Sequence, residues 1–346
     1  MLRSKSPTFI AGAILTFAIL LITFTFYGYQ IFFSPNFAFE KKKEYLYIPT
    51  GAVFTDVIDS LESNDLLHHK MSFAFTSKLL GYQDNVKPGR YAVYQKETNL
   101  SLIRRLKRGE QEPLKLTFNN IRLKKDFAER ISERMEFSFE ELDSLLNSPQ
   151  YLEEHGFNSY TILSMFIPNT YEIFWTTPAD KFFERMHSEY KKFWNEERLE
   201  KAKAIGLSPV EVTTLASIVE AETRMSDEKP RVAGVYMNRL KKGMLLQADP
   251  TVVYAIGDFT MKRVYKGATK FDSPYNTYMY AGLPPGPINM PSITSMDAVL
   301  NFEKHKYEYF CASPDFSGYH VFAESYEAHQ KNARSYQKAL NKSRIR

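Results

Sequence analysis

The chain has 346 residues, enough for a membrane anchor and about two domains, and its 44% hydrophobic and 25% charged residues are ordinary for a globular protein. The formal net charge of +5 is mild, and no basic run interleaved with aromatic residues indicates nucleic-acid binding, which we do not expect. The single cysteine, Cys311, excludes an intrachain disulfide and a cysteine-based zinc site. Without a phosphate loop or paired histidines, we expect no metal and no cofactor.

Residues 8–33 carry no charge and predict a transmembrane anchor, since about 20 apolar residues span a bilayer. Arg3 and Lys5 lie in residues 1–7, so the positive-inside rule predicts a cytoplasmic N-terminus at the plasma (inner) membrane and a periplasmic or extracytoplasmic position for the rest. A cleaved signal peptide is the alternative, but the apolar run is too long and no small-x-small cleavage site follows it.

Residues 34–43 are predicted to form a polar tether, and residues 44–118 a small α+β module. The expected elements are strands at 44–48, 90–94 and 114–118 and helices at 53–61, 71–80 and 100–107. This alternation of strands, turns and helices is similar to LysM-like glycan-binding modules. A spacer domain without a ligand is an equal alternative.

Residues 119–346 are predicted to form a second, mixed α+β domain. Up to residue 207 the signals are mostly helical, at 124–135, 139–146 and 179–194, with an extended segment at 165–172 that Pro168 interrupts. The whole chain is therefore predicted to be α+β, with a single transmembrane helix before two domains.

A helix is predicted from Pro209 to about Glu222. Ser208 suits its N-cap, Pro209 its first position, and Glu211 completes a capping box with Ser208. At 100° per residue, four apolar side chains gather on one side: Val212, Leu215, Ile218 and Val219.

Glu222 falls on this apolar side, whereas Glu220 points roughly 130° away from its middle. Desolvation raises the pKa of a carboxyl group, so Glu222 is a candidate general acid. The alternative is a helix-end glutamate that reaches solvent or pairs with an arginine such as Arg224.

Polar and proline-rich segments follow this helix and a second one at 227–240. Gln247 and Asp249 suit a site loop, although Asp249 is equally an N-cap for a helix at 252–255. Residues 273–292 form a stiff loop whose tyrosines and asparagine predict a sugar-binding wall: Tyr275, Asn276, Tyr278 and Tyr280. A strand at 307–312, the segment 318–323 and a basic helix from 326 end the chain. His320 and His329 are candidates to polarise a substrate oxygen.

Four motifs in this order, ASIVEAET, NRLKKGMLLQADPTVVYA, SPYNTYMYAGLPPGPI and HVF, resemble the YceG-like family of membrane-anchored endolytic murein transglycosylases. The resemblance implies cleavage of the MurNAc–GlcNAc β-1,4 bond in nascent peptidoglycan strands, leaving a 1,6-anhydro-MurNAc end. It places the catalytic glutamate at Glu220 or Glu222, and the following Thr223 favours Glu222. The positions expected to support it or to bind substrate are Glu220, Gln247, Asp249, Tyr275, Asn276, Thr277, Asn169 and His320.

Two positions depart from the family pattern. Leu163-Ser164 stands where the family often has Glu-Gly, and Asn169 stands where it has Asp. Asparagine cannot ionise, so any acid–base role of that position is in doubt here.

A lytic transglycosylase needs one carboxyl group, because the sugar's own 6-hydroxyl is the nucleophile. A hydrolytic muramidase, with Asp249 or Glu172 as second carboxylate, is one alternative. A non-catalytic glycan-binding membrane scaffold is another. The expected partners are glycan strands, the lipid bilayer and cell-wall synthases.

Overall fold

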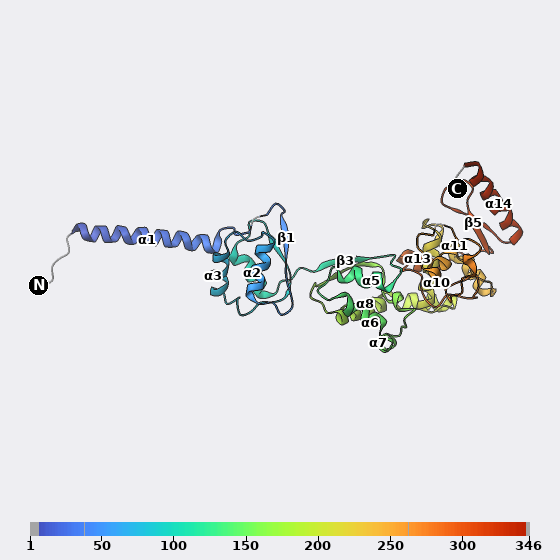
Figure 1. Ribbon diagram of the computed structural model, residues 1–346, viewed down its shortest axis with the longest axis horizontal. Helices are drawn as coiled ribbons and strands as arrows, with labels where there is room; N and C mark the ends of the chain where they lie inside the picture. The colour runs from blue at the N-terminus through green and yellow to red at the C-terminus, as the bar shows by residue number, and fades with distance from the viewer. Residues whose placement is uncertain (1–6, 38, 262, 344–346) are drawn as a thin grey trace. The chain divides into compact units, whose positions relative to one another are not determined.

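The computed structural model describes residues 7–37, 39–261 and 263–343 and confirms the predicted mixed α+β class (Figure 1). The chain divides into two compact units. Unit 1 contains Met1–Lys115 and Glu172–Thr177, and unit 2 contains Leu116–Tyr171 and Pro178–Arg346. The return of Glu172–Thr177 to unit 1 was not foreseen from the sequence.

Helix α1 spans Pro7–Phe33. Its apolar stretch, Thr8–Phe33, is long enough to cross a membrane. The most apolar part of this stretch is not buried against the rest of the protein. In water this surface would be unfavourable, so α1 fits the predicted membrane anchor.

Unit 1 follows the predicted order of strands and helices to within two residues. Its elements after α1 are β1 (Lys43–Ile48), α2 (Phe54–Ser63), α3 (Lys70–Leu79), β2 (Gly89–Tyr94) and α4 (Asn99–Arg108). β1 and β2 pair antiparallel, and α2 and α3 pack beside them around fully buried side chains such as Phe73 and Tyr91 (Figure 1). The likeness to a LysM module remains a prediction.

Residues at the start of the predicted tether (34–43) pack into unit 1. Phe37 is fully buried, and Asn36 donates a 2.7 Å hydrogen bond from its amide to Asn99. The Asn99 amide in turn donates to the carbonyl of Ile31 at the end of α1. The end of the anchor is thus bonded directly to the folded module.

The first part of unit 2 is built on aromatic packing. Its elements are β3 (Leu114–Phe118, which begins in unit 1), α5 (Lys124–Ser132), α6 (Phe139–Asn147), α7 (Pro149–Glu154), η1 (Ile162–Met165), β4 (Asn169–Ile173), α8 (Ala179–Phe193) and α9 (Glu196–Ile205). β3 pairs with β4. The ring centres of Phe127 and Phe166 are 4.2 Å apart, and both side chains are buried.

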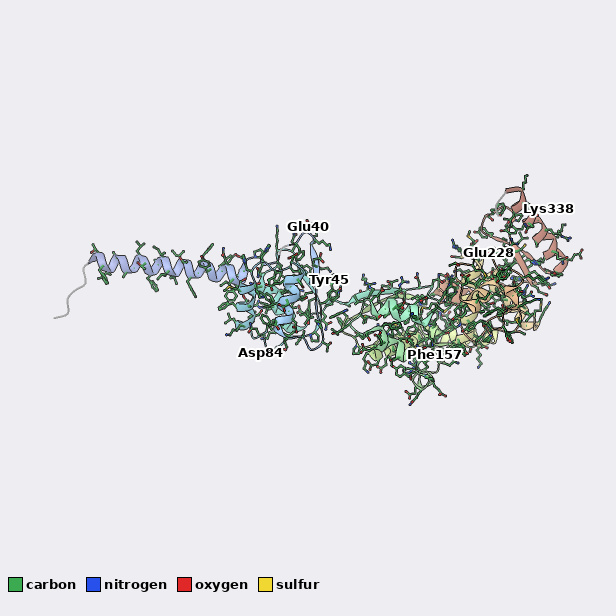
Figure 2. The ribbon with its side chains drawn as sticks, viewed as in Figure 1. Glu40, Tyr45, Asp84, Phe157, Glu228 and Lys338 are labelled. Atoms are coloured by element: carbon green, nitrogen blue, oxygen red, sulfur yellow. The ribbon has the colours of Figure 1, made fainter. Side chains whose placement is uncertain are left out.

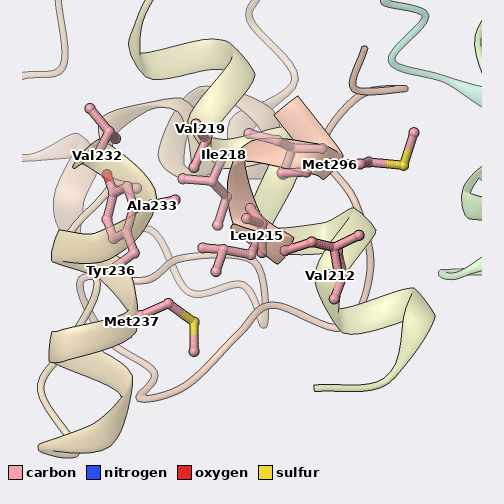
Figure 3. Packing of buried hydrophobic residues seen from close by; sticks show 14 of the residues in the cluster. Val212, Leu215, Ile218, Val219, Val232, Ala233, Tyr236, Met237 and Met296 are labelled. Atoms are coloured by element: carbon pink, nitrogen blue, oxygen red, sulfur yellow. The ribbon is translucent and has the colours of Figure 1, made fainter. Parts of the chain in front are cut away.

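The remainder of unit 2 surrounds one central helix. Its elements are α10 (Pro209–Glu222), α11 (Lys229–Lys241), α12 (Asp249–Ile256), η2 (Ala268–Lys270), α13 (Ile293–Leu300), β5 (Tyr309–Ala312), β6 (His320–Ala323) and α14 (Tyr326–Ser343). The predicted capping box of α10 is present, with Ser208 as N-cap. Figure 3 shows the apolar side chains of α10 against those of α11 and Met296 of α13.

The expected single apolar stripe on α10 is wrong. Every residue from Val212 to Val219 is buried, including Thr213, Thr214 and Ser217. The polar members of this run bond locally, since Thr213 donates to the Pro209 carbonyl and Ser217 to that of Thr214. α10 is therefore a core helix that is covered on most of its circumference.

Ser217 also fixes the proline-rich loop to α10. Its hydroxyl accepts a 3.0 Å hydrogen bond from the amide of Ile288, and its carbonyl accepts one of 2.9 Å from the side chain of Asn289. The loop passes so close to the chain at Tyr160 that a Cβ on Gly286 would lie 2.0 Å from that residue's carbonyl oxygen, so only glycine fits.

Replacing Ser217 with alanine is expected to lower the free energy of unfolding of unit 2 by about 1–3 kcal/mol, because the buried amide of Ile288 loses its acceptor. The measurement is urea unfolding of the detergent-solubilised chain in a Trp175→Phe background, where Trp194, 4% exposed in the core of unit 2, is the remaining tryptophan. The exposed Ser144→Ala on α6 is the control. Equal effects of the two substitutions would contradict the assigned role.

Candidate active site

The end of α10 opens onto two cavities in unit 2. The larger, about 590 Å³, is lined by Arg122, Arg224 and Arg263 among others, and we name it the arginine cavity. The smaller, about 310 Å³, is lined by His320 and His329 among others, and we name it the histidine cavity. Glu222 and Asp249 line both. The larger volume lies within the range of small-molecule and sugar sites.

Glu222 is the last residue of α10 and is only partly exposed. Its Oε1 accepts a 2.7 Å hydrogen bond from the hydroxyl of Tyr236 on α11. Among the described residues, its Oε2 accepts none. Burial raises the pKa of Glu222 to about 7; the negative charge of Asp249 adds to this rise, while the Tyr236 bond and the charge of Arg239 oppose it.

Glu220, two residues before Glu222 on the same helix, has different hydrogen-bond partners. Its Oε2 accepts hydrogen bonds from the hydroxyls of Ser292 and Ser295 and lies 2.9 Å from the ammonium nitrogen of Lys229. Burial tends to raise the pKa of Glu220, but these three donors together bring it below the ordinary value. Glu220 therefore carries a charge that is already compensated.

Asp249 and Gln247 lie at the start of α12. The prediction of Asp249 as the N-cap is wrong, because α12 begins at Asp249 and its N-cap is Ala248. Asp249 instead accepts a 2.5 Å hydrogen bond from the hydroxyl of Tyr278. Gln247 adopts a positive φ of 49° and lines the histidine cavity, and its backbone N–H donates a hydrogen bond to the carbonyl of Thr277.

The residues Tyr275, Asn276 and Thr277 are buried and line neither cavity. The Asn276 side chain donates to the carbonyls of Thr269 and Phe271, and the Thr277 hydroxyl accepts from the amide of Ala248. These contacts hold the loop against the start of α12. Tyr278 is the tyrosine of the predicted sugar-binding wall that lines a cavity with Glu222.

His320 lies in the histidine cavity and is oriented by the buried Glu228. The Glu228 carboxylate accepts 2.7 Å bonds from the backbone amide and the ring Nδ1 of His320, and a 2.9 Å bond from the hydroxyl of Thr223. In the described part of the chain, Nε2 of His320 forms no hydrogen bond. Thr223, the residue that follows Glu222, is thus linked to His320 through the carboxylate of Glu228.

Cys311 lines the same cavity, where burial raises the pKa of its thiol and disfavours the thiolate. Within the described ranges, no three His, Cys, Asp or Glu side chains are grouped so that they could share a metal ion.

The structure does not bring Asn169 to Glu222. Asn169 is exposed and lines a separate hollow with Thr170 and Ser292. Its side-chain oxygen accepts a hydrogen bond from the backbone amide of Thr170, the next residue in β4. Glu172, the other carboxylate considered as a catalytic partner, lines neither cavity and belongs to unit 1.

Sequence reasoning missed Tyr236, Arg239 and Glu228. Tyr236 and Arg239 are three residues apart and so share one face of α11, and both line the histidine cavity. No local pattern marks them, because their role depends on how α11 packs against α10. Glu228 was missed because the predicted helix at 227–240 included it as an ordinary charged residue, whereas it is the N-cap residue of α11.

The structure is thus that of an α+β protein with an apolar N-terminal helix. The partly exposed carboxyl group of Glu222, whose pKa is raised, lies between two cavities. The YceG-like family model matches residues 46–335, and the chain belongs to that family, which confirms the resemblance of its motifs.

The curated relatives of this chain include an endolytic murein transglycosylase of Streptococcus pneumoniae, which is 27% identical over 351 residues that cover 92% of this chain. This chain spans 63% of the length of that relative. The endolytic murein transglycosylase of Bacillus subtilis is 41% identical over 128 residues, 37% of this chain and 35% of the relative. The 2.6 Å crystal structure of a YceG-like protein of Listeria monocytogenes matches with a TM-score of 0.56 and 26% identity, covering 84% of this chain and 99% of that one.

The raised pKa of Glu222 has a consequence for stability. Its value of about 7 in the folded chain lies above the ordinary 4.5, so the folded state holds this proton more tightly than the unfolded state. The contribution of Glu222 to stability is therefore greatest below pH 4.5, declines as pH rises to 7, and is constant above. The total decline is at most about 3 kcal/mol.

Glu222→Gln is thus expected to be more stable than the wild type at pH 8 and close to it at pH 4. Glutamine cannot ionise but still accepts the Tyr236 hydrogen bond. Urea unfolding of unit 2, followed through Trp194, measures the difference at both pH values. The exposed Glu324→Gln should show no such pH dependence, and a pH-independent difference for Glu222→Gln would contradict the raised pKa.

Proposed function

We propose that this protein is a membrane-anchored lytic transglycosylase, which cleaves the MurNAc–GlcNAc β-1,4 bond of nascent peptidoglycan strands and leaves a 1,6-anhydro-MurNAc end. The names of its relatives in Streptococcus pneumoniae and Bacillus subtilis support the reaction class. One observation of this chain carries the proposal: the carboxyl of Glu222 lies on the wall of two cavities with a pKa of about 7. A group of that pKa can give and take a proton near neutral pH.

Glu222 performs both proton transfers in the proposed mechanism. As the bond between the anomeric carbon of MurNAc and the O4 oxygen of GlcNAc breaks, the protonated Glu222 donates its proton to that oxygen. The carboxylate then removes the proton of the MurNAc 6-hydroxyl while the 6-oxygen bonds to the anomeric carbon. Glu222 ends protonated, as it began, and no water is consumed.

The neighbours of Glu222 have complementary roles. Tyr236 donates to Oε1 in both protonation states, which leaves Oε2 to exchange the proton with the sugar. The anomeric carbon becomes positive in the transition state, and the exposed Asp249 supplies a negative charge on the same cavity wall. His320, fixed through Glu228, presents Nε2 for a substrate oxygen.

A hydrolytic muramidase is the second candidate, because Asp249 lines the same cavities as Glu222. In a hydrolase Asp249 would be the base or nucleophile, and its hydrogen bond from Tyr278 would have to be compatible with that role. A non-catalytic glycan-binding scaffold fits less well, because binding alone gives no reason to keep a protonatable carboxyl in a cavity.

The substrate also sets the topology. Peptidoglycan lies outside the plasma membrane, so α1 is proposed to place residues 1–7 in the cytoplasm and both units outside, in line with Arg3 and Lys5 before the apolar run. An anchored enzyme that cuts new strands works where they are made, so cell-wall synthases are the proposed protein partners.

Glu222→Gln is expected to reduce release of anhydro products at least about 100-fold, because the amide cannot donate or accept the catalytic proton. Mass spectrometry of products from purified glycan strands measures this and also separates the two reactions, since a hydrolysed product carries one additional water. Glu220→Gln, which keeps a polar side chain in the Lys229 network, should retain activity. Full activity of Glu222→Gln would move the acid to Glu220 or overturn the assignment.

The rate should also depend on pH through Glu222. Because the acid must be protonated when substrate binds, kcat/KM should fall above about pH 7. Tyr236→Phe removes a donor that favours the ionised form, so the pKa of Glu222 rises and the falling limb moves about one unit to higher pH. The exposed Tyr326→Phe is the control, and an unmoved limb in Tyr236→Phe would contradict the assignment of that limb to Glu222.

A further inference from the structure

We propose that the arginine cavity binds the carboxylates of the peptide stems carried by the glycan strand, so that the enzyme prefers peptide-bearing strands over bare ones. This inference rests on the proposed function for its substrate. Arg122 lies between β3 and α5, Arg224 directly after α10, and Arg263 between α12 and η2. Three separate segments thus contribute an arginine to the wall of one cavity.

All three arginines are exposed, and in the part of the chain that the structure describes none of them forms an ion pair with a carboxylate. Other arginines do so readily; Arg105, for example, binds Glu97 at 2.7 Å. Arg122 lies 4.8 Å from the ring centre of Phe259, a cation–π contact that limits its freedom without consuming its hydrogen-bond donors. The guanidinium groups are therefore available to a ligand.

The carboxyl groups in the same cavity do not cancel this positive charge. Glu220 is compensated by Lys229 and two serine hydroxyls. Burial favours the neutral form of Glu222, and Asp249 is bonded to Tyr278. An incoming anion thus meets three arginines that have no carboxylate partner, beside the carboxylate of Asp249.

The chemistry of the substrate identifies the anion. The sugar rings of a peptide-bearing strand are uncharged and offer an arginine only weak neutral acceptors, whereas removal of a peptide leaves one carboxylate on the lactyl group of its MurNAc. The peptide stems, attached to MurNAc next to the bond that Glu222 would cut, carry free carboxylates. Guanidinium groups bind carboxylates through two parallel hydrogen bonds, which are stronger than neutral ones. A stem on the MurNAc residue at Glu222 would therefore find matching charge in the arginine cavity.

Binding is tested with the full-length, detergent-solubilised chain carrying Glu222→Gln, so that strands stay intact and the result does not depend on cleavage. Fluorescence anisotropy measures Kd for three labelled strands: peptide-bearing, enzymatically stripped of peptides with the exposed lactyl carboxylates converted to amides, and peptide-bearing with the peptide carboxylates converted to amides. We expect peptide-bearing strands to bind about tenfold more tightly than the other two. Adding Arg122→Gln and Arg263→Gln should remove this preference, whereas Arg130→Gln, an exposed arginine on α5 outside the cavity, should preserve it.

Equal binding of all three strands would overturn the inference, as would a preference that survives in the Arg122→Gln/Arg263→Gln chain. Tight binding of the amidated strands would show recognition of the peptide without its charge and would also overturn it. Cleavage by the chain with its native Glu222 is measured separately on all three strands. A failure to cut any strand counts against the proposed function, while the binding preference still decides the role of the arginines.

Discussion

The number of hydrogen-bond donors around a partly buried carboxyl group is the constraint on which the proposed chemistry depends. Glu220 and Glu222 are two residues apart on one helix, yet the pKa of Glu220 is lowered and that of Glu222 is raised to about 7. Glu220 has two serine hydroxyls and the Lys229 ammonium, whereas Glu222 has the single hydroxyl of Tyr236. Environments that push two neighbouring pKa values apart separate a charged supporting group from an acid.

Such a difference persists only if the frame holds every donor in place. α10 lies inside the core, so its last turn cannot rotate without disturbing α11 and α13 (Figure 3). Ser217 bonds this helix to the proline-rich loop, and Thr277 bonds the loop to the start of α12. Figure 2 shows Glu228 within unit 2, where its bonds tie Thr223 to His320. Core packing and the site are thus one connected structure.

The sequence predicts the local features well and the long-range ones poorly. Capping signals place the start of α10 at Ser208 and Pro209, and the helix predicted at 100–107 agrees with α4 to one residue at each end. One of the two arguments for Glu222 over Glu220 rested on a single apolar stripe that does not exist, because polar residues on α10 form local hydrogen bonds and allow burial on most sides. The other argument, from Thr223, rested on the family resemblance. The partner of Glu222, Tyr236, could not be predicted, because only the packing of α11 brings it within 2.7 Å. Conversely, Tyr275 and Asn276 were expected at the site and instead stabilise the loop behind it.

The two kinds of residue around Glu222 come from different kinds of structure, and this has a physical reason. A proton transfer requires its donor and acceptor at fixed distance, so Glu222 and Tyr236 are on packed helices. Recognition of a flexible peptide stem tolerates, and benefits from, side chains that can follow their ligand, and Arg122, Arg224 and Arg263 are on the connections between elements. Because none of these guanidinium groups bonds to the helices that hold the acid, a change in them can alter which strands bind while the pKa of Glu222 is unaffected. The proposed substrate preference and the proposed acid chemistry are therefore separable in this fold, although they share one cavity.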